Sequence, residues 1–532
     1  MTRTRLFEEI EGALAEARRT LGETTPPMRA ISRRAALALM AAAAACTPSP
    51  AATSDEPPAL DGDPGAVAIV GGGVSGLVAA WRLASAGVPT EIFESTGRLG
   101  GRMYTLRDFT PEGQFCELGG EFVSSADEAL IRLCAELGVG LERLGLEGEV
   151  ASTVYDIGGK QFTDADLIDP VTATGAFLPV AARIAADQAA LLDGASEWTA
   201  RAHELDALPL SEYLKRLATT TESWVIDLLA LAWQSEFGIP VEQQSSLNLV
   251  DIIGTAPKQA FSMLGRHDGA FRIAGGSSTL TDVLAARLSA SPLSEKTTIH
   301  LSHQLYAVSR DGDGVQLSFR PEGDVPLKKT YARVIFALPF TRLRTMKGLG
   351  GLALPADKMT VINELGYGAN AKLAVGTSSR PWQEGIAGVP APVTGTIYSD
   401  RDFQLVWDTS AAQPGVGGVL TNFLSSDAAK LEEAQALARL EAGLESLAPK
   451  IARSLTPKVR ASFFWPTHPH TRGSYAGCLT GQYTSFAGVG ARPELDGRLV
   501  FAGEHTSVMA MGSMNGAIDA GERAAREIMS LR

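Results

Sequence analysis

Residues 66–87, AVAIVGGGVSGLVAAWRLASAG, decide the fold of this chain. The run 66–70 is short, apolar and rich in Val and Ile, which predicts a buried strand, and the apolar periodicity of the second half predicts a helix. Between them stand three glycines at GxGxxG spacing, Gly71, Gly73 and Gly76. In this order the first glycine permits a tight turn, the second lets the backbone approach a pyrophosphate, and the third lets helix and strand pack closely. The N–H groups that begin the helix then face the anion.

A second predicted strand, at 90–94, ends on an acidic residue, Glu94. Glu94 follows Gly71 by 23 residues, the spacing at which a carboxylate accepts hydrogen bonds from the ribose of a dinucleotide. The strand, the glycine turn, the helix and this acid together predict an α/β dinucleotide-binding domain.

Two further segments favour FAD over NAD as the dinucleotide. Residues 98–102, RLGGR, resemble the RxGGR sequence that follows the ribose carboxylate in flavoproteins with two dinucleotide-binding domains. Arg98 and Arg102 offer forked donors to a pyrophosphate, and Gly101 allows close contact. Residues 116–122, CELGGEF, resemble the next segment of those proteins, where backbone passes by the flavin ring.

The C-terminal segment carries the most specific resemblance in the chain. Residues 497–528, GRLVFAGEHTSVMAMGSMNGAIDAGERAAREI, resemble the C-terminal signature of the flavin amine oxidases over its whole length. Within it, 499–502 predicts a strand and 513–528 a helix. The resemblance implies that this helix points its N-terminus at the flavin, where its dipole stabilises negative charge. Weaker family-like pieces stand in the family's order at 271–276, 299–308 and 334–339.

This resemblance covers nearly everything from Ala66 to the end of the chain and implies an interleaved architecture. We expect an α/β protein with a two-dinucleotide-binding-domain type FAD-binding Rossmann-like fold and a mixed α+β substrate domain. The predicted FAD-binding parts are 66–145, 266–345 and 456–532, and the predicted substrate parts are 146–265 and 346–455. Ala- and Leu-rich patterns at 176–235 and 428–453 predict helices in the substrate domain.

The family resemblance also extends the set of cofactor contacts beyond the first glycine turn. Leu305 falls near the position whose backbone meets the adenine, and Gly503 and Glu504 follow the last predicted strand. The full predicted set is Gly71, Gly73, Ser75, Gly76, Glu94, Arg98, Gly101, Arg102, Leu305, Gly503, Glu504 and Met514.

Lys372 is the first candidate catalytic residue. It stands in 366–382, GYGANAKLAVGTSSRPW, flanked by apolar residues in an apparent strand. The resemblance implies that Lys372 holds a water at flavin N5. The alternative is an edge-strand lysine that faces solvent, because such lysines protect sheets against aggregation.

Residues 465–482, WPTHPHTRGSYAGCLTGQ, resemble the stretch that passes the flavin in the amine oxidases and in their histone-demethylase and polyamine-oxidase branches. Tyr475 matches one wall of the family's aromatic cage, and Trp465 is a further catalytic candidate. The less favoured alternative is that both are core aromatics. Ser474 stands where the monoamine oxidases attach flavin through a cysteine, and Cys478 lies a few residues away. The resemblance therefore implies noncovalent FAD.

Ser513 stands where the monoamine oxidases have their other cage tyrosine, which makes it a candidate substrate contact. The incomplete cage weakens the case for small arylalkyl amines and leaves polyamines, amino acids and larger amines open as substrates. The implied reaction is oxidation of an amine C–N bond, with O2 as the expected acceptor and imine or aldehyde, ammonia and H2O2 as products. Two alternatives share the glycine motifs: a C–C desaturase or protoporphyrinogen-oxidase-like enzyme, and a noncatalytic flavin-binding module.

Composition excludes several other classes of function. The 47 basic and 60 acidic residues give a net charge of −13, the wrong sign for a protein that binds nucleic acid. Four cysteines without a CxxC pair, and no third ligand near His468 and His470, predict no metal site.

Residues 1–46 predict an export signal. Arg33 and Arg34 precede an apolar run at 35–45 and resemble a twin-arginine signal, and the run is too short to span a bilayer. Cys46 follows small residues that resemble a lipoprotein cleavage site, which makes it a possible lipid anchor. Residues 47–65 predict a flexible linker. We therefore expect an exported protein, periplasmic or associated with the cell envelope.

Overall fold

The computed structural model describes residues 65–531, apart from 145–151, 170–173, 194–196, 256–267, 322, 324 and 392. The predicted export signal and all but the last residue of the predicted linker lie outside the described residues. Within the described part of the chain, no helix combines the length and the apolar composition needed to cross a membrane.

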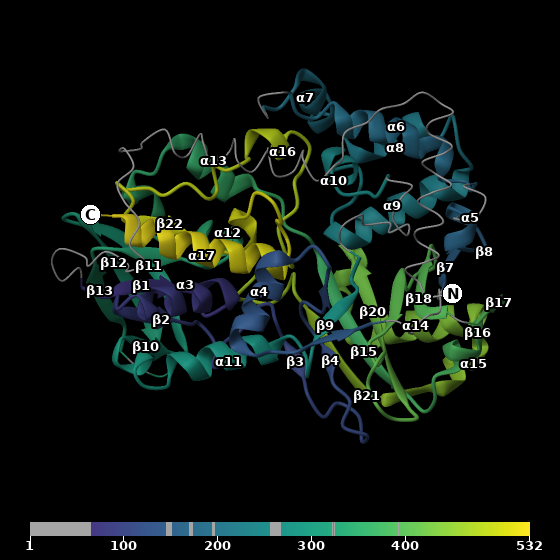
Figure 1. Cartoon of the computed structure of the whole chain (residues 1–532), viewed down its shortest axis with the longest axis horizontal. Helices are drawn as coiled ribbons and strands as arrows, with labels where there is room; N and C mark the ends of the chain where they lie inside the picture. The colour runs from purple at the N-terminus through teal and green to yellow at the C-terminus, as the bar shows by residue number, and fades with distance from the viewer. Residues whose placement is uncertain are drawn as a thin grey trace.

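A five-stranded parallel sheet, in the order β10-β2-β1-β14-β22, forms the centre of the first body (Figure 1). The strands are β1 (Val67–Val70), β2 (Thr90–Phe93), β10 (Thr297–His300), β14 (Val334–Phe336) and β22 (Leu499–Phe501). Stretches of chain that are far apart in sequence complete this one sheet. Every residue of β1 is buried, as a parallel sheet covered on both faces requires.

Alternate residues of these strands enter two different hydrophobic cores. Val67, Ile69 and Ile92 face a layer of helices, whereas Ala68 and Phe93 face an antiparallel meander and two further helices. The first layer consists of α3 (Val74–Ser85), α4 (Glu128–Leu137), α11 (Ser278–Leu288) and α17 (Met514–Ser530). The opposite layer consists of β11 (His303–Asp311), β12 (Gly314–Pro321), β13 (Leu327–Tyr331), α12 (Phe340–Leu343) and α13 (Ala356–Glu364).

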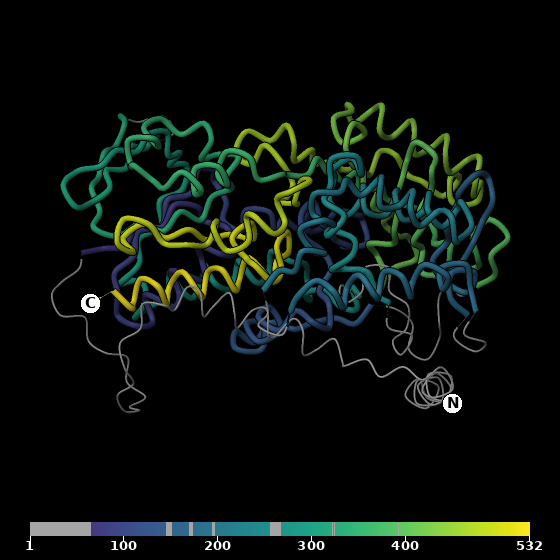
Figure 2. Tube along the Cα trace, turned by 90° about the horizontal axis from the view of Figure 1, so that it is seen from above, coloured from purple at the N-terminus to yellow at the C-terminus, as the bar shows by residue number. Residues whose placement is uncertain are grey.

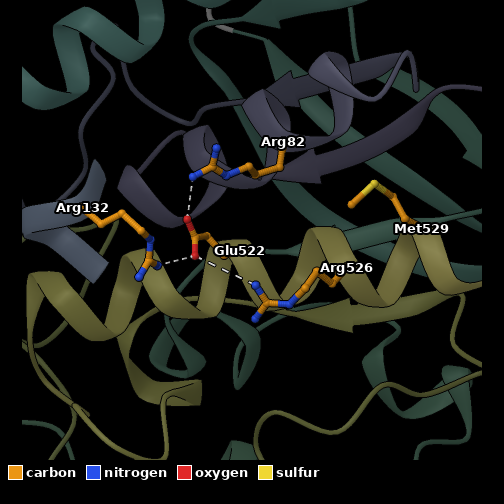
Figure 3. A pocket seen from close by; sticks show the side chains of 5 residues that line it. All are labelled: Arg82, Arg132, Glu522, Arg526 and Met529. Atoms are coloured by element: carbon orange, nitrogen blue, oxygen red, sulfur yellow. Dashed lines mark hydrogen bonds and ion pairs between the residues drawn. The ribbon is translucent and has the colours of Figure 1, made fainter. Parts of the chain in front are cut away.

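A charge cluster fixes three helices of the first layer to one another. The buried Glu522 of α17 lies 2.7 Å from Arg82 of α3 and 2.8 Å from Arg132 of α4, with Arg526 at 4.0 Å (Figure 3). Together with Met529 these side chains border a surface hollow of about 390 Å³. The three arginines therefore compensate one buried carboxylate and tie the C-terminal helix to the first domain segment.

A seven-stranded sheet, in the order β21-β15-β20-β19-β18-β7-β8, forms the second body (Figure 1). Figure 2 shows the two bodies side by side, seen from above. The strands are β7 (Ser152–Ile157), β8 (Lys160–Thr163), β15 (Asn370–Thr377), β18 (Val393–Ser399), β19 (Leu405–Asp408), β20 (Gly418–Ser425) and β21 (Leu455–Phe464). All neighbours pair antiparallel except β18 and β7.

Two groups of helices accompany the second sheet. The first group is α5 (Asp164–Leu167), α6 (Leu178–Ala189), α7 (Ala200–Asp206), α8 (Leu210–Leu217), α9 (Ser223–Phe237) and α10 (Leu247–Val250). The second is α14 (Glu433–Leu447) and α15 (Pro449–Ser454). The predicted helical ranges 176–235 and 428–453 contain most of these residues, whereas α5 and α10 lie outside them. Helix α9 runs against β20, β18 and β7, so it crosses one face of the sheet.

Short strands lie between the two bodies (Figure 1). They are β3 (Thr105–Leu106), β4 (Cys116–Glu117), β5 (Phe122–Val123), β6 (Leu141–Arg143) and β9 (Phe271–Ile273). The hairpin of β16 (Gly385–Ile386) and β17 (Val389–Pro390) packs against β18, and α16 (Gln482–Ser485) packs against α7. Strand β21 pairs with β15, so the predicted boundary at residue 456 falls within a strand of the second sheet. The domain boundaries stay predictions.

Candidate functional site

The glycine turn between β1 and α3 is shaped as the motif predicts. A Cβ on Gly71, whose φ is +115°, would lie 2.5 Å from the Ala337 carbonyl oxygen, and one on Gly76 would lie 2.0 Å from the Gly71 oxygen. A Cβ on Gly73 meets only the Cα of Gly101, at 3.9 Å. No side chain caps α3. The turn therefore leaves open backbone and free helix N–H groups where a pyrophosphate binds.

Glu94 lies at the end of β2, beside this turn, and is 8% exposed. Its Oε2 accepts a hydrogen bond from the Gly72 N–H at 2.9 Å, and its Oε1 accepts from the Thr96 N–H and hydroxyl, both at 2.8 Å. These bonds fix the carboxylate at the carboxyl edge of the parallel sheet, where open α/β sheets bind their ligands. Its contact with a ribose stays a prediction.

Arg98 and Arg102 hold the loops around the turn. Arg98 donates to the carbonyl of Gly101 at 2.6 Å. Arg102 forms an ion pair of 2.5 Å with Glu504 and also donates to the Ser474 carbonyl at 2.9 Å. Two predicted cofactor contacts, Arg102 and Glu504, are therefore each other's partners.

The first and last segments of the chain meet at this edge. The Ser75 hydroxyl accepts a hydrogen bond from the Gly503 N–H at 2.9 Å. Ser513 caps α17, since its hydroxyl accepts from the Gly516 N–H at 2.9 Å. Met514 begins that helix, and its side chain occupies the space that a Cβ on Gly120 would need. Ser513 thus has a structural task, and its contact with substrate stays a prediction.

Leu305 lies in β11 and is 5% exposed. The strand is fastened to the Glu94 region through the His303 N–H, which donates to the Glu94 carbonyl at 2.7 Å. The structure thus brings Leu305 to the same edge as the glycine turn.

Lys372 lies in β15, between β20 and β21, so the edge-strand alternative is wrong. Its side chain is 7% exposed, and Nζ lies 2.8 Å from Oε2 of Glu121, which is 3% exposed. The Thr409 hydroxyl donates to the other Glu121 oxygen at 3.1 Å. Glu121 is not among the residues predicted from the sequence, although its carboxylate stands within the CELGGEF segment.

The Trp407 ring lies beside the Lys372 ammonium. Nζ lies 5.1 Å from the centroid of the Trp407 ring. That ring contacts Phe122 and Phe423, each with centroids 5.4 Å apart. Sequence reasoning missed these three aromatics because they come from three separate strands. Together the three rings form an aromatic cluster beside the Lys372 ammonium.

The two aromatics predicted in 465–482 have different surroundings. Tyr475 is half-buried, and its hydroxyl donates to the Glu236 carbonyl at the end of α9. Trp465 is buried and donates from Nε1 to the Leu118 carbonyl at 2.9 Å, so it fastens the CELGGEF segment. Its catalytic assignment stays a prediction, as does the aromatic-cage role of Tyr475.

The position predicted to decide covalent attachment is buried. Ser474 donates from its hydroxyl to Asn370 Oδ1 at 2.6 Å, two residues before Lys372 in β15. Burial raises the pKa of the nearby Cys478 thiol to about 12, which keeps it protonated and weakly nucleophilic.

The CELGGEF segment contains a second buried carboxyl group, that of Glu117. Glu117 accepts bonds from the Ser277 N–H at 2.6 Å and the Ser277 hydroxyl at 2.8 Å. Burial raises its pKa to about 7. No group of three or more possible metal ligands occurs among the residues the structure describes.

A comparison with known protein families identifies the family of this chain. The model of the flavin containing amine oxidoreductases matches residues 74–529, from the glycine turn to the end of α17. This chain belongs to that family. It is thus a flavin-containing amine oxidase, and FAD is the cofactor that the family uses.

Individual relatives are distant but cover most of the chain. Amine oxidase [flavin-containing] B of Sus scrofa is 25% identical over 481 residues, which is 87% of this chain and 86% of the relative. An L-amino acid dehydrogenase of Synechocystis is 25% identical over 489 residues, 87% of this chain and 94% of the relative.

Solved structures share the fold. Putrescine oxidase bound to putrescine superposes with a TM-score of 0.68 at 22% identity, covering 87% of this chain and 99% of that one. Cyclohexylamine oxidase from Brevibacterium oxydans gives a TM-score of 0.71 at 21% identity, covering 87% and 98%.

The residues at the carboxyl edge of the parallel sheet fit FAD. The Gly73 backbone is open, the first turn of α3 is uncapped and Glu94 is held at the strand end. Gly73, Glu94 and the start of α3 would hold the dinucleotide, and the start of α17 would face the ring system.

Proposed function

We propose that this chain oxidises the C–N bond of a primary amine and reduces O2. One amine, one O2 and one water give aldehyde, ammonia and H2O2. Bound FAD would supply the acceptor for the hydride equivalent that leaves the carbon beside nitrogen. The observation that carries the proposal is the buried Lys372 ammonium, held by Glu121 beneath aromatic rings.

The chain's own residues have three tasks in this proposal. Trp407, Phe423 and Phe122 form an apolar wall that excludes water from the reacting carbon. Lys372 holds a water and places a positive charge where electron transfer to oxygen builds negative charge. Glu121 fixes the lysine rotamer through a buried ion pair.

A peroxide screen tests the proposed reaction. Purified protein with full flavin content is mixed with monoamines, diamines and amino acids, because the relatives' names include amine oxidases and an amino acid dehydrogenase. Amine-dependent release of H2O2 and ammonia in equal amounts is expected. Flavin-free protein is the control. Turnover only with an artificial electron acceptor would overturn the assignment of O2.

We also propose that FAD is bound noncovalently, because a buried serine, Ser474, replaces the cysteine of the monoamine oxidases. Acid precipitation should leave the flavin absorbance in the supernatant. Flavin that stays with the pellet would contradict this and implicate Cys478.

We further propose export through the twin-arginine pathway, from the sequence of residues 1–46. Replacing Arg33 and Arg34 by lysine should retain the protein in the cytoplasm. Unchanged export on cell fractionation would contradict the proposal. A lipid mass on Cys46 would separately establish a membrane anchor.

A further inference from the structure

The surface hollow bordered by α3, α4 and α17 carries an excess of positive charge (Figure 3). Arg82 is held within the fold, because it donates to the two Glu136 oxygens at 2.7 and 2.8 Å and to Glu522 at 2.7 Å. Among the described residues, Arg132 and Arg526 have only Glu522 as a carboxylate partner. Three arginines thus face two carboxylates, and one positive charge remains on a chain whose net charge is −13.

Most N–H donors of Arg132 and Arg526 lack an acceptor among the residues that the structure describes. Arg132 donates once, from Nη2 to Glu522 Oε2 at 2.8 Å, and its side chain is 56% exposed. Arg526 Nη1 lies 4.0 Å from the same oxygen, too far for a hydrogen bond, and its side chain is 59% exposed. Because a guanidinium group has five N–H donors, both arginines can bind a further acceptor.

Arg523, on the same helix as Arg526, is satisfied within the fold. It pairs with Glu527 at 2.8 Å and donates to the Phe501 carbonyl at 2.7 Å and to the Thr506 hydroxyl at 3.0 Å. Helix α17 therefore uses one arginine to fasten β22 and the turn that follows it, and leaves the other open toward the hollow.

The shape and chemistry of the hollow suit a phosphate group. Its volume is about 390 Å³, and Met529, which packs against the first hydrophobic core, adds an apolar border. Figure 3 shows Arg132 and Arg526 approaching Glu522 from two different helices. The forked donors of arginine match phosphate oxygens, and one phosphate can accept from two arginines at once. Glu522 opposes this attraction little, because its side chain is 9% exposed and paired with Arg82.

The hollow lies away from the glycine turn that would hold the dinucleotide. Helix α17 starts at the candidate site with Met514, and at about 1.5 Å per residue Glu522 lies about 12 Å along it. Arg82 lies in the last turn of α3, and the loop after that helix accepts a hydrogen bond from the Val67 N–H, through the Pro89 carbonyl at 2.8 Å. This end of α3 is therefore at the edge where β1 begins, opposite the edge that fits FAD.

We propose that Arg132 and Arg526 bind a phosphate group in this hollow, while Arg82 and Glu522 hold the three helices in place. The inference does not depend on the proposed amine oxidation. A lipid headgroup and a soluble phosphate both carry this group, and the two sources are distinguished by experiment. In either case the bound anion would supply the acceptors that the fold leaves out.

The first experiment is calorimetric titration of FAD-loaded protein with inorganic phosphate. Arg132→Gln/Arg526→Gln should weaken binding about tenfold, because both forked donors are lost. Arg82 stays paired with Glu522 in this variant, so the unfolding midpoint should be close to that of wild type. Arg526→Gln removes no hydrogen bond of the described fold and should show part of the same loss. Arg439→Gln, an exposed arginine on α14, is the matched control and should bind as wild type does.

The second experiment is sedimentation of FAD-loaded protein with vesicles of phosphatidylglycerol and phosphatidylcholine, or of phosphatidylcholine alone. Sedimentation with the anionic vesicles that Arg132→Gln/Arg526→Gln lacks would assign a lipid headgroup. Calorimetric binding of inorganic phosphate without sedimentation would assign a soluble phosphate. The proposal is overturned if wild type binds neither probe, or if the double variant binds as strongly as wild type wherever binding occurs.

Discussion

Glu121 contacts Lys372, and Glu236 accepts the Tyr475 hydrogen bond through its backbone, but among the described residues only Glu121 has a cation partner. Glu121 lies 2.8 Å from Lys372 and also accepts from Thr409. Glu236 has no such partner among the described residues, and burial raises its pKa to about 7. The comparison indicates that the fold supplies a cation for the first carboxylate and, among the described residues, none for the second.

Removing the cation of the compensated pair should have the largest effect. Lys372→Met keeps a similar volume but removes the charge that stabilises electron transfer to oxygen. We expect flavin reoxidation to slow by about thirty- to a thousandfold, equivalent to about 2–4 kcal/mol. Stopped-flow measurement of both half-reactions checks this, with flavin content shown to be complete.

The control for this experiment removes both charges. Lys372→Met leaves the buried Glu121 without its cation, so the double variant Lys372→Met/Glu121→Gln separates loss of folding from loss of rate. An oxygen rate constant at the wild-type value in both variants would remove Lys372 from the chemistry.

The uncompensated carboxylate should make stability depend on pH. The folded pKa of Glu236 is about 7 against 4.5 ordinarily, so the unfolded chain loses this proton first as pH rises. The contribution of Glu236 to stability is intact below pH 4.5 and falls until pH about 7, by at most about 3 kcal/mol. Glu236→Gln should not show this loss. Its unfolding midpoint minus that of wild type should therefore be larger above pH 7 than below pH 4.5. A difference between the two midpoints that stays constant with pH would contradict the comparison.

Neutralising the compensated carboxylate should have the smallest effect. Glu121→Gln keeps an acceptor for Thr409 but leaves the buried Lys372 with a weaker partner, which costs about 1–3 kcal/mol of unfolding free energy. Denaturant unfolding measures this loss. Asp427→Asn removes a carboxylate from the exposed Lys430–Asp427 pair and should show no measurable change. Equal results for the two variants would mean that burial adds nothing to the Lys372 pair.

The sequence predicts the site best where the residues that form it are adjacent in the chain. The turn at Gly71 to Gly76 needs residues without a Cβ at defined spacing, and these are visible in the chain. The wall around Lys372 joins Phe122, Trp407 and Phe423 from three strands, so no local pattern announces it. Glu236 was missed for the same reason, because a single acid in a helix carries no sign of its partners.

The anaerobic half-reaction tests the central claim most directly. Holoenzyme is mixed with an amine in the absence of oxygen while the flavin absorbance is followed, and air is then admitted. The account predicts that at least one amine bleaches the flavin and that oxygen restores the colour with release of H2O2. Fully flavinylated protein whose absorbance stays unchanged with every monoamine, diamine and amino acid would contradict it.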